Sequence, residues 1–92
     1  MIKEIRDGNT LLAILISGRF KESGITFFTE GSLSQQLAFM NHPKGKEIAP
    51  HIHNSVHREV TTTQEVLILR KGRLRVDFYG EDRDYLESLV IE

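Results

Sequence analysis

The chain has 92 residues, no cysteine, and 12 lysines and arginines against 13 aspartates and glutamates. This length predicts a single domain, and the near balance of charge gives no field to attract nucleic acid or an anionic membrane, so we expect neither as a partner. Without cysteine, the metal ligands left are histidine, carboxylate and water. Charged residues interrupt the N-terminus, and the apolar run 11–16 is too short to span a bilayer, so we expect a cytoplasmic protein.

Turn residues divide the first part of the chain into short segments. The turn at Asp7-Gly8-Asn9 separates residues 1–6 from residues 10–16. Residues 10–16 contain good helix formers, but they lack polar residues at helical spacing, so we predict a buried strand. Residues 32–41 are compatible with either a helix or a strand.

The C-terminal part predicts a β-hairpin. Residues 73–79 alternate polar and apolar side chains, residues 85–91 return as the partner strand, and residues 81–84 form a solvated tip. Arg73, Arg75 and Asp77 point outward from this strand, which either cross-strand pairing or solvation explains. The residues expected to face a core are Leu74, Val76 and Phe78.

Two histidines one residue apart predict a metal site. Side chains alternate faces along a strand, so His51 and His53 project to the same side. Glu65 opens the aliphatic run 66–69, which ends shortly before Gly72 and predicts a second strand with a tight turn. If the two strands pair, two imidazoles and one carboxylate meet around one divalent ion. The alternative for Glu65 is an exposed glutamate at the end of a strand.

This spacing resembles the first motif of the cupins, G-x5-H-x-H-x(3,4)-E-x6-G. Gly45, His51 and His53 match its left half, and Glu65 and Gly72 match its right half. The resemblance covers roughly the second half of the chain.

The chain departs from the cupin pattern in two places. The connector 54–64 is longer than the pattern has, and Glu59 lies nearer the expected distance from His53, but no glycine follows Glu59 at the required position. The second cupin motif, G-x5-P-x-G-x2-H, is missing, since no histidine follows His57 and no proline follows Pro50. We therefore expect a shortened version of a longer domain.

The resemblance implies an all-β fold, a cupin-like jelly-roll sandwich or barrel truncated at the C-terminus. We expect one domain over residues 1–92, with N-terminal strands in 1–42, the metal-motif region in 45–72 and a closing hairpin in 73–92. In a jelly roll, residues 32–41 form a strand antiparallel to the strand that follows it.

The resemblance also implies metal ligation by His51, His53 and Glu65, with Fe, Mn, Zn or Ni as the divalent ion. Substrate-binding candidates are Gln36, which otherwise satisfies backbone groups at the barrel mouth, and Arg58, which is otherwise a solvated loop residue. His57 is the candidate general acid or base, with an exposed loop histidine as the alternative.

The expected function is that of a small-molecule metalloenzyme, a dioxygenase or an isomerase-like enzyme. Two histidines and one carboxylate leave coordination positions open, which suits Fe(II) with dioxygen or a Lewis-acid metal. The alternative is a cupin that binds or senses a sugar or another small ligand without turnover.

The aliphatic run also predicts self-association. Val66 and Ile68 lie opposite the expected metal face, where a sheet open to water ordinarily carries polar residues. We expect a symmetric homodimer that uses this face or the N-terminal strands.

Overall fold

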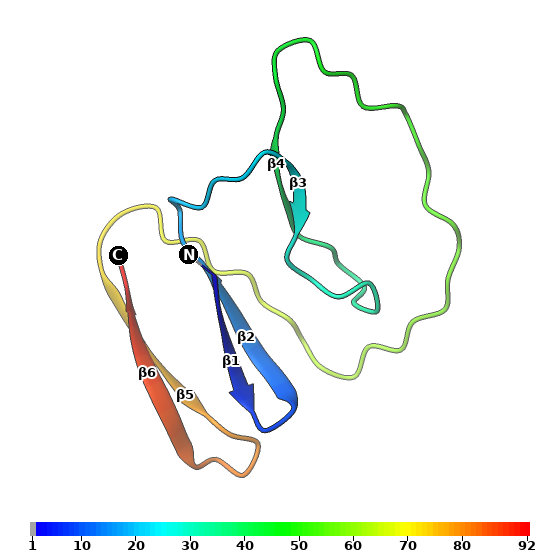
Figure 1. The fold of residues 1–92 in the computed structure, drawn as a ribbon. Coiled ribbons are helices and arrows are strands. Elements are labelled where there is room, and N and C mark those ends of the chain that lie inside the picture. Colours follow the sequence, from blue (N-terminus) through cyan, green and yellow to red (C-terminus); the bar gives the residue numbers. More distant parts are fainter. Residues whose placement is uncertain (1) are drawn as a thin grey trace. The chain divides into compact units, whose positions relative to one another are not determined.

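The computed structural model describes residues 2–92 and contains six strands in three separate antiparallel hairpins, which confirms the all-β prediction (Figure 1). Each sheet formed by residues 2–92 has two strands, so no barrel or sandwich closes among them. These residues also contain no helix long and apolar enough to cross a membrane. The strands are β1 (Ile2–Asp7), β2 (Thr10–Ile16), β3 (Gly24–Phe27), β4 (Ala38–Asn41), β5 (Leu74–Tyr79) and β6 (Tyr85–Ile91).

The chain divides into two compact units. One unit, here called the two-hairpin unit, combines the chain up to Gly18 with Gln64–Glu92 and holds β1, β2, β5 and β6. The other, here called the histidine unit, is Arg19–Thr63 and holds β3 and β4.

The β1–β2 hairpin provides the centre of the two-hairpin unit. Ile5 is 0% exposed and is the one fully buried large side chain among residues 2–92. Ile5 pairs with Ala13 and Arg6 pairs with Leu11, so Leu12 is an extra residue in β2 and the ladder bulges there. The strand predicted over residues 10–16 is confirmed, but its apolar residues are half-buried rather than buried, because a two-stranded sheet covers them incompletely.

The β5–β6 hairpin follows the sequence prediction closely. Val76 pairs with Leu89 and Asp77 pairs with Ser88. The tip closes through hydrogen bonds from Gly80 N to Asp84 O and from Arg83 N to Gly80 O, both 2.8 Å long. Val76 and Phe78 are half-buried, whereas Leu74 is 41% exposed, so the predicted apolar face meets a core only toward the tip.

Two polar contacts join these hairpins. Asp7 Oδ2 accepts a hydrogen bond from Glu81 N at 3.2 Å, and Lys3 Nζ lies 3.0 Å from Glu87 Oε1. Gly80 is buried beside the first contact, and a Cβ added to it would lie 2.7 Å from Asp7 Oδ2. A side chain at position 80 would therefore displace the Asp7 carboxylate from this contact.

The histidine unit is built on the β3–β4 hairpin and a cluster of aromatic rings. Phe20 packs edge-on against Phe28 and Phe39, with ring centroids 5.0 and 5.2 Å apart. The strand predicted within residues 32–41 forms only over Ala38–Asn41, and it pairs with the preceding β3 rather than with its successor. Residues 32–37 instead belong to the loop between the two strands.

Residues 42–73, here called the strandless segment, contain neither helix nor strand (Figure 1). The strands predicted around residues 51–53 and over 65–69 are therefore not formed. The apolar side chains are correspondingly exposed, Ile52 by 92% and Ile68 by 80%. Both predicted strands needed a partner far away in the sequence, and this structure supplies none within residues 2–92.

Candidate metal centre

The two histidines lie side by side although no strand holds them. The ring centroids of His51 and His53 are 5.3 Å apart, with the ring planes at 79°. Both side chains are exposed. The i, i+2 spacing thus places the imidazoles together, as the sequence predicted, without the hydrogen-bonded ladder that the prediction invoked.

A local hydrogen bond orients His51. Its Nδ1 lies 3.1 Å from the carbonyl oxygen of Ala49. Since a carbonyl only accepts, this bond requires the proton on Nδ1 and leaves the lone pair of the neutral ring on Nε2. Such a bond from one ring nitrogen to a backbone carbonyl is how metal-ligating histidines are commonly fixed. His51 is therefore suited to bind a metal through Nε2.

The third predicted ligand, Glu65, lies in the two-hairpin unit, whereas the histidine pair lies in the histidine unit. Among residues 2–92, no group of three histidine, aspartate or glutamate side chains is positioned to hold a metal ion. The structure therefore brings two of the three predicted ligands together, and ligation by Glu65 stays a prediction.

A cavity begins next to the histidine pair. It has a volume of about 450 Å³ and includes Ala49, whose carbonyl accepts from His51. The sequence prediction missed this cavity, which is lined by the half-buried His42. The other lining residues are Ile25, Met40, Lys46, Glu47 and Ile48. The walls thus combine apolar side chains with both signs of charge, and every lining residue except His42 is exposed, so the cavity is open to solvent.

Gln36 closes the loop between β3 and β4. Its Nε2 donates to the carbonyls of Glu30 and Leu33 at 2.8 and 2.9 Å, and its Oε1 accepts from Thr29 Oγ1 at 2.8 Å. These bonds occupy both ends of the amide and match the alternative in which Gln36 satisfies backbone groups. Substrate binding by Gln36 stays a prediction that must compete with them.

Arg58 and His57 lie in the part of the strandless segment that follows the histidine pair. Arg58 Nη2 donates to Gly31 O at 3.0 Å, which ties the connector to the β3–β4 loop. A guanidinium has five donors, so this bond leaves others for an anionic ligand. His57 is exposed, and its acid–base role stays a prediction.

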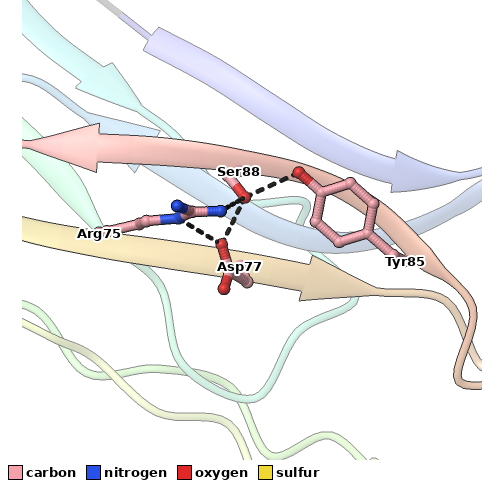
Figure 2. Close-up of polar contacts among 4 residues, drawn as sticks. All are labelled: Arg75, Asp77, Tyr85 and Ser88. Carbon is pink, nitrogen blue, oxygen red and sulfur yellow. Dashed lines mark hydrogen bonds and ion pairs between the residues drawn. The ribbon is translucent and has the colours of Figure 1, made fainter.

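Four side chains on the β5–β6 hairpin form a polar cluster that the sequence did not predict as a site (Figure 2): Arg75, Asp77, Tyr85 and Ser88. The single hydroxyl hydrogen of Ser88 is donated to Asp77, so in the 2.8 Å bond between Tyr85 and Ser88 Oγ the tyrosine hydroxyl is the donor. Arg75 Nε also donates to Asp77, at 2.9 Å. The bond from Ser88, followed by the bond from Arg75, holds the pKa of Asp77 below its ordinary value. A carboxylate stabilised in this way is a poor base. The bond from Ser88 to Asp77 joins β5 to β6, so it is the cross-strand pairing predicted for Asp77. Arg75 bonds Asp77 within β5 and is itself exposed.

Comparisons with family models, with curated proteins and with solved structures find no match. The resemblance to cupins therefore rests on the spacing of Gly45, His51, His53, Glu65 and Gly72. The structure adds the paired imidazoles, the bond from His51 to Ala49 and the neighbouring cavity.

Proposed function

We propose that this chain is a cupin-like protein that binds one divalent ion with His51, His53 and Glu65 and takes a small molecule into the cavity beside Ala49. The observation that carries the proposal is the pair of imidazoles 5.3 Å apart, with His51 oriented by the Ala49 carbonyl. Iron, manganese, zinc and nickel all accept imidazole and carboxylate ligands, so the ion is a divalent metal of this group.

The finer architecture that we propose is a cupin-like jelly roll in the metal-bound chain. All three proposed ligands lie on the strandless segment, which has no regular structure of its own. Where ligands lie on such a segment, the free energy of metal binding contributes to its folding. An ion that draws Glu65 to the histidines therefore favours pairing of the two predicted strands that carry them.

The cavity supports an enzymatic role for the site. When bound, the metal supplies either Lewis-acid polarisation of a carbonyl or carboxylate or a binding site for dioxygen. Lys46 provides a positive charge for an anionic group, and Met40 and Ile48 provide apolar wall for the rest of the molecule. His42, half-buried in the same wall, is placed to exchange a proton with the ligand. These residues fit a dioxygenase or isomerase-like enzyme that acts on a small organic acid.

Metal analysis of protein purified without added metal tests the site. We expect about one ion per chain, with imidazole nitrogens at about 2.0–2.2 Å from a metal such as zinc. Replacing both His51 and His53 with alanine should abolish binding. His57→Ala is the matched control, because it removes an exposed histidine of the same segment outside the pair. Full metal occupancy in the double variant contradicts the assignment.

A second pair of variants tests the carboxylate and the reaction. Glu65→Gln should weaken metal binding, whereas Glu59→Gln, the same change in the connector, should leave it unchanged; the reverse result reassigns the ligand. A dioxygen-uptake screen over small acids and phenols then separates the two functions. Loss of metal and uptake together in His51→Ala supports the enzyme, and ligand binding that persists without metal supports a binding or sensing protein.

A further inference from the structure

The end of the strandless segment has the composition of a strand but no partner. Residues 66–69 are Val-Leu-Ile-Leu, and the exposed fractions of Val66, Leu67 and Ile68 are 67%, 73% and 80%. Aliphatic and β-branched residues of this kind fit a sheet. None of the backbone hydrogen bonds found among residues 2–92 outside the strand ladders involves residues 66–69, so their donors and acceptors are free for another strand.

We infer that, in the metal-free protein, residues 65–71 pair edge to edge with the same residues of a second copy of this chain, antiparallel and in one register. Charge points to this partner. Glu65 precedes the aliphatic run, and Arg70 and Lys71 follow it. A parallel pair of copies places like charges side by side at both ends, whereas an antiparallel pair places the carboxylate of one copy beside the cations of the other.

Symmetry restricts the register. The two-fold axis that relates two antiparallel strands stands perpendicular to their sheet, so it keeps every side chain on its own face. Directly opposed residues share a face, and faces alternate along a strand, so opposed positions are both odd or both even. The axis therefore passes at a residue, and registers centred between two residues are excluded.

One of the remaining registers pairs opposite charges at both ends of the aliphatic run. With Ile68 opposite Ile68 of the second copy, Glu65 faces Lys71, Leu67 faces Leu69 and Val66 faces Arg70. A centre at Leu67 places Glu65 opposite Leu69, and a centre at Leu69 places Leu67 opposite Lys71. Each of these shifts sets a charge against an aliphatic side chain, as the Ile68 register does at Val66 and Arg70, but only the Ile68 register also pairs Glu65 with a cation within residues 65–71. The strand pair is therefore centred on Ile68.

The pairing belongs to the metal-free protein because Glu65 is also the carboxylate of the proposed metal site. One carboxylate cannot serve the ion and Lys71 of another copy equally well. The inference stands without the metal site, since the register follows from residues 65–71 alone, and its test is done in the presence of a chelator.

Charge reversal tests the register. In sedimentation equilibrium with chelator, we expect the wild-type protein to dimerise. Glu65→Lys and Lys71→Glu each set like charges against one another at both ends of the strand pair, so each should weaken association about tenfold or more. Glu59→Lys, the same charge change outside the pair, should not. A wild-type chain that stays monomeric at every concentration overturns the inference, and so does equal weakening by Glu59→Lys.

Mixing the two variants gives the decisive result. In a mixed pair, the lysine introduced at position 65 of one variant faces the glutamate introduced at position 71 of the other, and the unchanged Lys71 faces the unchanged Glu65. The mixture should therefore form a heterodimer although each variant alone associates weakly, and a chain carrying both changes should dimerise as the wild type does. Because association is regained, misfolding of the variants cannot produce this outcome. A mixture that associates no better than its components overturns the inference.

Discussion

The β5–β6 hairpin and the strandless segment carry similar local signals and have different structures. Both contain apolar residues in patterns that predict strands, at 74–79 and at 65–69. In the hairpin, β6 begins six residues after β5 ends. The hydrogen bonds of Gly80 close the turn between them, so that β6 runs back alongside β5. The strand predicted at 65–69 has no such neighbour. A strand-forming sequence becomes a strand only when another backbone reaches it, and the cost of bringing that backbone grows with the intervening chain.

The largest expected effect comes from giving the strandless segment an ion to bind. If the metal and the second copy compete for Glu65, an ion at about a hundred times its Kd should weaken dimerisation about a hundredfold or more. Sedimentation equilibrium with and without metal measures this, and the variant with both His51 and His53 replaced by alanine is the control in which metal should have no effect. Tighter dimerisation with metal contradicts the competition.

Amide hydrogen exchange compares the two regions directly. In dilute metal-free protein, amides of residues 66–69 lack the ladder hydrogen bonds of β5 and β6, so they should exchange about a hundredfold faster than paired amides of those strands. Mass spectrometry of peptides covering each region reads the difference. If residues 66–69 exchange as slowly as the paired amides of β5 and β6, residues 66–69 are not unpaired. If residues 66–69 become protected only at high protein concentration, the result supports pairing between two copies of the chain.

The two-hairpin unit can be destabilised at Gly80, where its two hairpins approach each other most closely. Gly80→Ala places a Cβ 2.7 Å from Asp7 Oδ2, so the Asp7 carboxylate must turn away from the amide of Glu81, and we expect a loss of about 0.5–1.5 kcal/mol in the free energy of unfolding. Urea denaturation measures it. Gly18→Ala is the control, because a Cβ at Gly18 meets no heavy atom within 4 Å. If both variants are equally stable, the close contact does not hold the hairpins together.

The smallest effect is a pH dependence that belongs to the hairpin alone. The bonds from Ser88 and Arg75 lower the pKa of Asp77 in the folded state. These bonds therefore stabilise the folded protein at pH values above the unfolded pKa of about 3.9. The stabilisation is lost as the pH falls through the lower pKa of the folded state. Asp77→Asn should therefore flatten the acid limb of stability against pH slightly, because the group is exposed to solvent. Thermal unfolding between neutral and acid pH measures it, and an unchanged acid limb contradicts the assignment.

What the sequence predicts well here is local. Alternation over 73–79 and the turn residues between β5 and β6 predict the hairpin and its partner strand, and the i, i+2 spacing predicts that His51 and His53 lie together. Both relations span a few residues, so the covalent chain alone brings the groups near one another. The expected burial of residues 10–16 was only half right, because apolar composition does not say how many layers will cover a strand.

What the sequence does not predict is set by longer-range packing and by competing bonds. Gln36 looks like one of two equivalent glutamines, and only the positions of the Glu30 and Leu33 carbonyls show that its amide is used in the loop. The cavity near His42 depends on how residues 46–49 return toward β3 and β4, which no periodicity encodes. Clustering of Glu65 with the histidines likewise depends on a pairing of distant segments.

The bond between Asp7 and the amide of Glu81 has a consequence for the speed of folding. It joins residues 74 positions apart, so the two-hairpin unit is complete only when the first and last parts of the chain have met. Each hairpin can form within microseconds because its strands are neighbours, but docking requires a large loop to close first. Refolding should therefore show early hairpin formation and a slower docking step, and lengthening the strandless segment should slow docking and leave hairpin formation unchanged.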